Sequence, residues 1–330
     1  MRAPVFWEGG LDPRSREAAP LTRALLTPAS ALYAFSARSK RERAKPVNIG
    51  RPIICIGNLT LGGAGKTPVA AAIRDRLSAA GLRVATLSRG YGGSNPGPTK
   101  VDASATARTV GDEPLMLAGS GEAWIGRDRL AAARAMAADG VEAIVMDDGH
   151  QNHAVLKSIS LIVIDTGDPV GNGYVFPKGP LREPIRDGLD RADAVVLMGE
   201  RETPEILESF PGPLLRCRLA PRSEPPPGPV VAFAGIGRPE KFFDTLDAAG
   251  AEMVDAAPFP DHHRFARGDL NLLHKLAEER GAALITTEKD FVRLDPEDRR
   301  GIHVFRVAAE FENTAQLDAL LAPVVDEFRG

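Results

Sequence analysis

The sequence has little cysteine, no long apolar run and almost no net charge, and each shortage excludes a class of protein. Two cysteines, Cys55 and Cys217, are too few for a disulfide framework or a cysteine metal site, and they favour a reducing compartment. No run of roughly 18 apolar residues is present to span a membrane, and no secretory signal opens the chain. The formal net charge of −3 gives no general reason to expect a nucleic-acid partner.

A glycine-rich turn after the apolar run Ile53–Gly57 is the most informative feature of the sequence. Its residues are Thr60, Leu61, Gly62, Gly63, Ala64, Gly65, Lys66 and Thr67, and a helical pattern follows. In such a loop the backbone N–H groups bind phosphate oxygens, Lys66 reaches the β and γ phosphates, and the Thr67 hydroxyl ligates Mg²⁺. Thr60 replaces the first glycine of the usual G-x-x-x-x-G-K-[ST] pattern, but the flanking strand and helix favour an ATP-binding loop over a plain βα turn.

Helical patterns that end in glycine and pass directly into β-branched runs recur along the chain, as in βαβ units. Near-continuous apolar runs at 84–87, 143–146, 161–165 and 194–198 predict a mostly parallel sheet with helices on both faces. The fold class that we expect is therefore α/β.

The length of the chain and its proline distribution predict two domains. Prolines cluster over 211–229 and indicate a stiff, exposed connector, after which the same strand and helix pattern resumes. We expect a phosphate-loop domain over 46–210 and a smaller C-terminal α/β domain over 230–330. Two lobes joined in this way place a site between them, where closure excludes water.

Residues 1–45 differ from the rest of the chain because an apolar stretch interrupted by Pro28 precedes a basic cluster. That cluster consists of Arg38, Lys40, Arg41, Arg43 and Lys45. A Pro-interrupted amphipathic pair of short helices would lie on an anionic membrane surface, with Tyr33 and Phe35 at the interface. Packing on the protein's own body with a solvated basic end explains the pattern equally well.

Acidic residues and histidines occur at three further places suited to chemistry. Asp147 and Asp148 follow the strand at 143–146, where a Walker B carboxylate lies beside Mg²⁺, and this interpretation is favoured over a solvated acidic turn. Asp112 lies in a Gly-Asp-Glu-Pro segment that is either catalytic or a helix start, and spacing does not decide between them. His262 is able to pair with a carboxylate and help take a proton, whereas helix capping by Asp261 is the alternative.

Two loops complete the candidates. Phe176–Pro184 is a rigid basic loop, containing Arg182 and Glu183, that is suited to an anionic substrate group. Thr286–Asp290 superficially resembles a guanine-reading N-K-x-D motif, but its lysine and aspartate are adjacent. The wrong spacing favours ATP over GTP.

Six motifs, in sequence order, resemble the tetraacyldisaccharide 4′-kinase family, the lipid A 4′-kinases of Gram-negative bacteria. They are Gly57–Thr60 with Gly62–Pro68, Ser88–Gly92, Gly111–Pro114, Asp147–Gln151, Pro180–Glu183 and Phe259–His263. The resemblance extends over essentially the whole chain and accounts for Thr60. His150 is a departure, because that position is more often Phe in the family, and it affects only the packing beside Asp148.

The resemblance implies a P-loop kinase domain with a mostly parallel sheet plus a smaller C-terminal α/β domain. It implies transfer of the γ-phosphoryl group of ATP to the 4′-hydroxyl of tetraacyldisaccharide 1-phosphate, which gives lipid IVA. The cofactors are ATP and Mg²⁺, and the partners are the lipid A disaccharide precursor and an anionic membrane surface. We expect a monomer held peripherally at the cytoplasmic face of the bacterial inner membrane.

The resemblance also implies a role for each candidate residue. Lys66 and the loop amides hold the phosphates, and Lys66 also takes part in catalysis. The remaining roles are Mg²⁺ binding by Thr67 with Asp147 or Asp148, catalysis by Asp112 and His262, and contact with the substrate or metal by Arg182 and Glu183.

Two alternatives stay open on the sequence. A soluble-metabolite P-loop kinase or ligase, such as those of biotin synthesis, would not need the apolar and then basic N-terminal segment. A membrane ATPase switch of the MinD type usually has a second lysine before the paired glycines, where this chain has Leu61.

Overall fold

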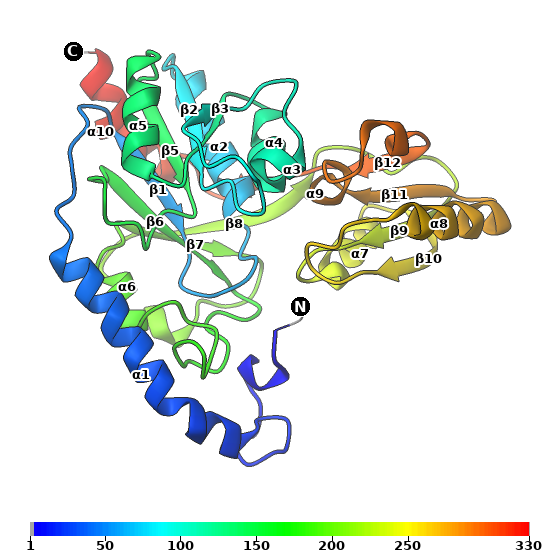
Figure 1. The fold of residues 1–330 in the computed structure, drawn as a ribbon, viewed down its shortest axis with the longest axis horizontal. Helices are drawn as coiled ribbons and strands as arrows, with labels where there is room; N and C mark the ends of the chain where they lie inside the picture. The colour runs from blue at the N-terminus through cyan, green and yellow to red at the C-terminus, as the bar shows by residue number, and fades with distance from the viewer. Residues whose placement is uncertain (1–2, 330) are drawn as a thin grey trace.

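The computed structural model describes residues 3–329 and contains two β-sheets flanked by helices (Figure 1). Residues 1, 2 and 330, which the predicted segments 1–45 and 230–330 include, lie outside the described residues. We refer to the two halves as the large-sheet lobe and the small-sheet lobe. The mixed α/β architecture with a large, mostly parallel sheet confirms the predicted fold class.

The large sheet has nine strands in the order β13-β8-β7-β6-β1-β5-β2-β4-β3. Neighbouring strands run parallel except at the two edges, where β13 pairs with β8 and β3 pairs with β4 in antiparallel fashion. The strands are β1 (Ile53–Gly57), β2 (Val84–Ser88), β3 (Thr99–Lys100), β4 (Ala123–Ile125), β5 (Ala143–Asp147), β6 (Ile159–Asp165), β7 (Ala194–Met198), β8 (Leu214–Pro221) and β13 (Val307–Phe311).

Helices cover both faces of this sheet, so its central strands are buried along their whole length. Successive side chains of a strand point to opposite faces. Ile54 therefore packs against α2 (Lys66–Ala79) and α10 (Thr314–Arg329), whereas Ile53 packs on the side of α5 (Arg129–Ala138). The shorter elements around the sheet are η1 (Val5–Trp7), α3 (Ala107–Val110), α4 (Asp112–Ala118), α6 (Ile185–Leu189) and η2 (Glu205–Leu207).

The small sheet has four parallel strands in the order β10-β9-β11-β12. Phe242 of α7 packs on one face and Leu273 of α8 on the other. The elements of this lobe are β9 (Pro229–Ala234), α7 (Pro239–Ala248), β10 (Glu252–Pro258), α8 (Arg267–Arg280), β11 (Ala283–Thr287), α9 (Glu288–Phe291), η3 (Pro296–Arg299) and β12 (Ile302–Phe305).

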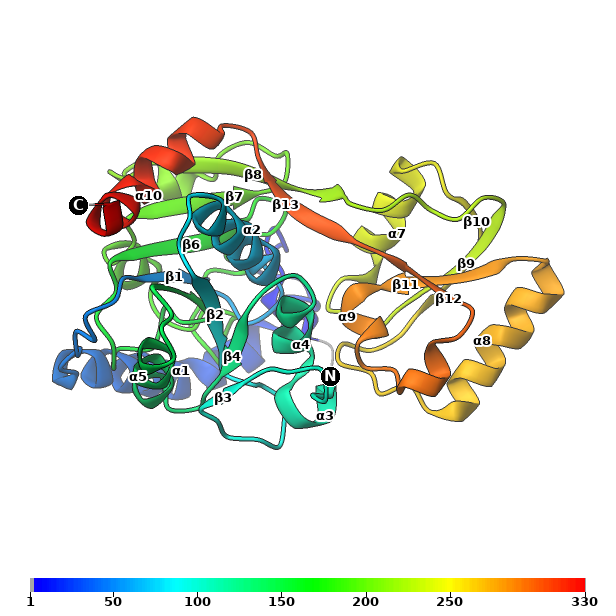
Figure 2. The same cartoon turned by 90° about the horizontal axis from the view of Figure 1, so that it is seen from above.

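The structure differs from the predicted connector at 211–229 and from the predicted C-terminal domain at 230–330. β8 occupies much of the connector and is a sheet strand, with Leu215 and Cys217 buried, because its apolar residues precede the main proline cluster. The chain after β12 returns along β8 as β13 and packs α10 on the large sheet, so β8 and β13 link the lobes as a two-stranded ribbon (Figure 2).

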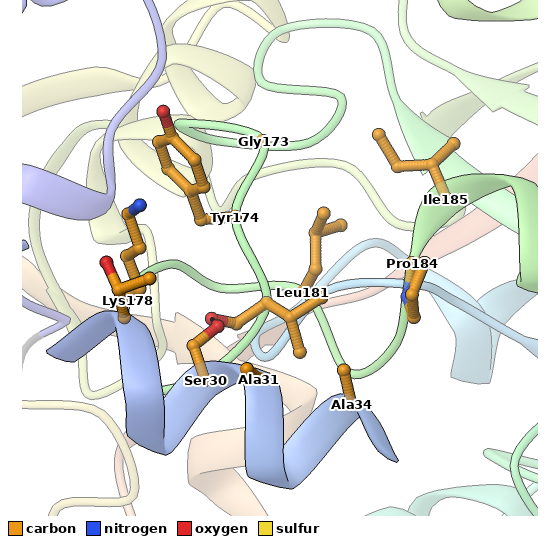
Figure 3. A pocket seen from close by; sticks show the side chains of 11 residues that line it. Ser30, Ala31, Ala34, Gly173, Tyr174, Lys178, Leu181, Pro184 and Ile185 are labelled. Atoms are coloured by element: carbon orange, nitrogen blue, oxygen red, sulfur yellow. Dashed lines mark hydrogen bonds between the residues drawn. The ribbon is translucent and has the colours of Figure 1, made fainter. Parts of the chain in front are cut away.

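The N-terminal segment also differs from the predicted pair of short helices, because α1 (Pro20–Arg43) is one helix with Pro28 inside it. Pro28 cannot donate to the Ala24 carbonyl, but both residues are exposed, so water is able to satisfy that carbonyl. α1 lies across the loop at 173–185, where the Ser30 hydroxyl donates to the Val175 carbonyl at 2.7 Å. A hollow of about 340 Å³ remains beneath it, lined by Ala31, Ala34, Leu181, Pro184 and Ile185 among others (Figure 3).

Candidate active site

The phosphate loop connects β1 to α2 and lies at the carboxyl edge of the parallel strands. Gly62 and Gly65 have φ angles of +130° and +84°, which residues other than glycine rarely adopt. Thr60 is not among the residues with positive φ, so its backbone needs no glycine. The Leu61 amide instead donates to the Pro180 carbonyl at 2.7 Å, which ties the start of the loop to the basic loop at 176–184.

Thr67 and Asp147 form the oxygen-rich part of the site. The Thr67 hydroxyl donates to Asp147 Oδ2 at 2.9 Å, while Asp147 Oδ1 is buried and has no hydrogen-bond partner among the described side chains and backbone. Burial raises the pKa of Asp147 to about 7, the charge of Glu113 adds to this effect and the charge of Lys66 opposes it. An unsatisfied carboxylate oxygen beside a hydroxyl fits Mg²⁺, which prefers few protein oxygens together with phosphate and water.

Asp148 has different neighbours although it is adjacent in sequence. Its carboxylate lies 3.4 Å from Lys66 Nζ and accepts from Arg182 Nη1 at 2.9 Å, and its φ is +53°. Burial would raise the pKa of Asp148, but Lys66 and Arg182 outweigh burial and the pKa is lowered. Of the two aspartates, therefore, Asp147 has the free oxygen and Asp148 orients the two cations.

Arg182 and Glu183 point to different surroundings. Arg182 Nε donates to the Thr60 carbonyl at 3.0 Å, so this guanidinium borders the phosphate loop. Glu183 is only 5% exposed, and both its oxygens accept from Arg191 Nη2 at 2.8 Å. Gln151 Nε2 also donates to Glu183 at 3.0 Å. The charge of Glu183 is therefore already paired inside the protein beside the Arg182 loop. Its role near the substrate or metal stays a prediction.

Asp112 and His262 meet although they come from different lobes. Asp112 is the first residue of α4, and His262 follows β10 with a φ of +57°. His262 Nδ1 lies 3.3 Å from Asp112 Oδ2, and the His262 ring contacts the ring of Tyr91 at a centroid distance of 5.8 Å. His263 instead pairs with Asp269 at 2.9 Å within the small-sheet lobe. Of these two histidines, the predicted catalytic residue His262 is thus the one that faces Asp112.

The glycines around Asp112 explain how its position is fixed. A Cβ on Gly111 would lie 2.4 Å from the Tyr91 carbonyl oxygen, and one on Gly93 would lie 2.6 Å from the Thr109 carbonyl oxygen. Side chains at these positions would push the two backbone segments apart. The Ser88–Gly92 motif therefore packs directly on the segment that leads into Asp112.

Sequence reasoning missed Arg293 and assigned no role to Lys289. Arg293 Nε donates to Asp112 Oδ2 at 2.9 Å, and Lys289 Nζ donates to Glu113 at 3.1 Å. Burial would raise the pKa of Asp112, but the hydrogen bond from His262 and the charges of Lys289 and Arg293 outweigh burial and hold that pKa well below its usual range. The available signal was that both cations follow the carboxyl end of β11, where sites of parallel sheets lie.

Comparisons with known proteins show the family of the chain. The sequence profile described as tetraacyldisaccharide-1-P 4′-kinase matches residues 22–326. A tetraacyldisaccharide 4′-kinase of Hyphomonas neptunium is 60% identical over 98% of both chains. One of Maricaulis maris is 46% identical over 99% of this chain and 97% of its own.

A solved structure shares the fold. The crystal structure of LpxK from Aquifex aeolicus in complex with ATP matches with a TM-score of 0.73 and 24% identity, over 92% of this chain and 99% of that one. The family profile matches most of the chain, and the relatives align over nearly their full length. These two findings identify the family. The chain belongs to the tetraacyldisaccharide 4′-kinase family.

Proposed function

We propose that the protein transfers the γ-phosphoryl group of ATP to the 4′-hydroxyl of tetraacyldisaccharide 1-phosphate. The observation that carries the proposal is a phosphate loop whose Lys66 and Thr67 lie beside two acidic residues, in a chain of the tetraacyldisaccharide 4′-kinase family. Membership of this family decides against the MinD-type switch and against a kinase or ligase of soluble metabolites.

The loop and its neighbours bind the triphosphate. Backbone amides from Gly62 to Lys66 surround the phosphates at the N-terminus of α2, whose dipole favours anions. Lys66 and Arg182 neutralise phosphate charge. Thr67 and Asp147 would hold Mg²⁺, which supplies further neutralisation of the phosphate oxygens when bound. Neutralisation and positioning are the main requirements of phosphoryl transfer, because its transition state is loose.

The acceptor hydroxyl meets Asp112. The carboxylate orients the hydroxyl and receives its proton late in the transfer, while the imidazole of His262 holds the carboxylate from the small-sheet lobe. A low pKa at Asp112 suits this role, because the carboxylate stays ionised and a strong base is not required in a loose transition state.

The exposed face of α1 binds the membrane that contains the acylated substrate. Among the described residues no helix has the length and apolar character needed to cross a bilayer. Leu21, Leu25, Leu32 and Phe35 are exposed by 81%, 81%, 69% and 69% and, at 100° per residue, fall in one stripe opposite Ser30. Arg43 continues this stripe at the basic end of α1, which suits anionic headgroups. We place the protein peripherally at the cytoplasmic face of the inner membrane, as a monomer with a complete site in each chain.

A label-transfer assay tests the proposed function. The protein is incubated with γ-labelled ATP, Mg²⁺ and either mixed micelles containing the lipid A disaccharide precursor or micelles alone. Label should enter the lipid only with the wild-type chain and the precursor, and the Lys66→Ala variant should transfer none. ATP hydrolysis at the same rate with and without the precursor, and with no label in the lipid, would instead support a membrane switch and refute the kinase proposal.

A further inference from the structure

The side chain of Arg293 connects both lobes at the site. It is 8% exposed and follows α9 in the small-sheet lobe. Its Nε and Nη2 atoms donate to Asp112 Oδ2 at 2.9 and 2.5 Å, and its Nη1 donates to the Gly235 carbonyl at 2.7 Å. Nη2 also lies 3.2 Å from His262 Nδ1. One guanidinium therefore touches both members of the proposed catalytic pair.

The other side of this guanidinium is fixed within the small-sheet lobe. Asp290 is fully buried and accepts from Arg293 Nη1 at 2.7 Å. The same carboxylate accepts from the Gly235 amide at 2.9 Å and from the Thr287 hydroxyl at 2.7 Å. Arg293 is thus held by a bonded set of small-sheet groups, so its orientation follows that lobe and not the large-sheet lobe.

Asp112, in contrast, belongs to α4 of the large-sheet lobe, which lies opposite α9 (Figure 2). Lys289 and Glu113 form a second ion pair across the same boundary at 3.1 Å. Asp112 Oδ1 accepts the Glu113 amide at 3.0 Å and keeps a lone pair for an acceptor hydroxyl, while Oδ2 is taken by Arg293 and His262. Because Arg293 and His262 both contact Oδ2, Oδ1 is the carboxylate oxygen that is left to face the substrate.

We propose that Arg293 is a positioning residue that orients the Asp112 carboxylate relative to His262 and makes this orientation depend on contact between the lobes. The inference rests on the proposed function, because Asp112 acts on the acceptor hydroxyl only if the protein is the kinase described above. When the small-sheet lobe moves away, Arg293 leaves with it and Asp112 loses its alignment. Transfer is thereby restricted to the assembled site, where water has less access to the γ-phosphate.

A purely structural role for Arg293 in lobe docking is the competing explanation, and the chain offers a matched control. Arg238 of the small-sheet lobe pairs with Asp165 at 2.7 Å and with Asp168 at 3.0 Å in the large-sheet lobe. This pair also joins the lobes through a guanidinium, but it involves neither Asp112 nor His262. Arg238→Met therefore weakens lobe contact without touching the proposed catalytic pair.

The experiment is a double-mutant cycle with the full-length protein. We would measure kcat and KM for the lipid acceptor, the nucleotide Kd and the melting temperature for Arg293→Met, Asp112→Asn, the double variant and Arg238→Met. Arg293→Met should lower kcat about tenfold to a hundredfold, as expected for lost alignment of a reacting group, with the nucleotide Kd within about twofold. In the Asp112→Asn background the same change should have little further effect, because the carboxylate that it positions is gone.

Three results would overturn the inference: an unchanged kcat in Arg293→Met, equal factors in both backgrounds, or an equal loss of kcat in Arg238→Met. If Arg293→Met does not fold, Arg293→Lys takes its place in the double-mutant cycle. Lysine keeps the positive charge but not the pair of guanidinium donors that contact Asp112. An inactive wild-type protein in the label-transfer assay would instead refute the proposed function. The two failures are therefore distinguishable.

Discussion

The Thr67 hydroxyl donates to Oδ2 of Asp147, and the other oxygen of that carboxylate is buried without a hydrogen-bond partner in the described part of the chain. A buried carboxylate is costly unless it is bonded or paired with a cation. Asp148, by contrast, is paired with Lys66 and Arg182. The two adjacent aspartates therefore have different surroundings, a distinction that their sequence does not contain.

Asp147→Asn should remove most Mg²⁺-dependent turnover, because an amide replaces the carboxylate beside the cation. We expect kcat to fall on the order of a hundredfold, which corresponds to the few kcal/mol that a bound metal contributes to charge stabilisation. Phosphoryl transfer measured against Mg²⁺ concentration checks this result. Asp139→Asn, which changes an aspartate in an exposed pair with Arg83, is the matched control and should leave the Mg²⁺ curve unchanged. Normal Mg²⁺ dependence in Asp147→Asn would move the metal site elsewhere.

Asp112→Ala should separate chemistry from nucleotide binding. The carboxylate faces the small-sheet lobe and its partners are His262, Lys289 and Arg293, so its loss should reduce kcat by about 10² to 10⁴. The ATP Kd from calorimetry should stay nearly constant, whereas Lys66→Ala should abolish both binding and turnover. A collapse of nucleotide binding in Asp112→Ala would assign this residue to the phosphate or metal site.

Local patterns were sufficient to predict the elements that form the central sheet. The strand predicted at 194–198 is β7, and the run Ile53–Gly57 is β1, because buried parallel strands need apolar residues at every position. The phosphate loop was recognisable for a similar reason. Its glycines, which allow the loop conformation, and Lys66, which binds phosphate, are close together in sequence. One short segment therefore contains both features.

Long-range pairing accounts for what the sequence did not predict. β13 joins the large sheet by pairing with β8, with Phe311 opposite Cys217, although residues 222–306 separate the two strands in sequence. Arg293 reaches Asp112 over a separation of 181 positions. No spacing rule connects residues so far apart, and both contacts exist only because the chain leaves the large sheet and returns to it.

His150 should make folding stability depend on pH. Its Nε2 donates to the Gly188 carbonyl and its Nδ1 accepts from the Ser160 hydroxyl, so the ring is buried and neutral. Burial, aided by the charges of Lys157 and Arg191, lowers the pKa of His150 to about 3. An unfolded histidine binds its proton near pH 6.5, so the unfolded state takes up the proton first and stability is lost as pH falls from about 6.5 toward 3.

The measurement for His150 is urea unfolding at pH 7 and pH 5 for the wild type and for His150→Gln, which bonds similarly but does not titrate. Between these pH values His150 alone should cost the wild type about 2 kcal/mol that the variant does not lose. Other titrating groups contribute to both proteins and cancel in the comparison. Equal losses of stability in the two proteins would mean that the imidazole is not held neutral in the folded state.

The exposed stripe of α1 should determine membrane binding independently of catalysis at the phosphate loop. Leu25→Glu combined with Leu32→Glu places two charges where we expect acyl chains, so co-sedimentation with anionic vesicles should fall at least tenfold. Leu272→Glu, an equally exposed leucine on α8 in the other lobe, is the control and should bind vesicles as the wild type does. The nucleotide Kd should be unchanged in all three proteins, because α1 packs on the loop at 173–185 and pairs with Asp187 through Arg41, whereas no contact among the described residues joins it to Lys66 or Thr67. Deletion of residues 20–45 should release the protein from membranes altogether. If the deleted protein stays in the membrane pellet, a surface other than α1 holds it there, and the basic cluster at the end of the helix is then only a solvated terminus.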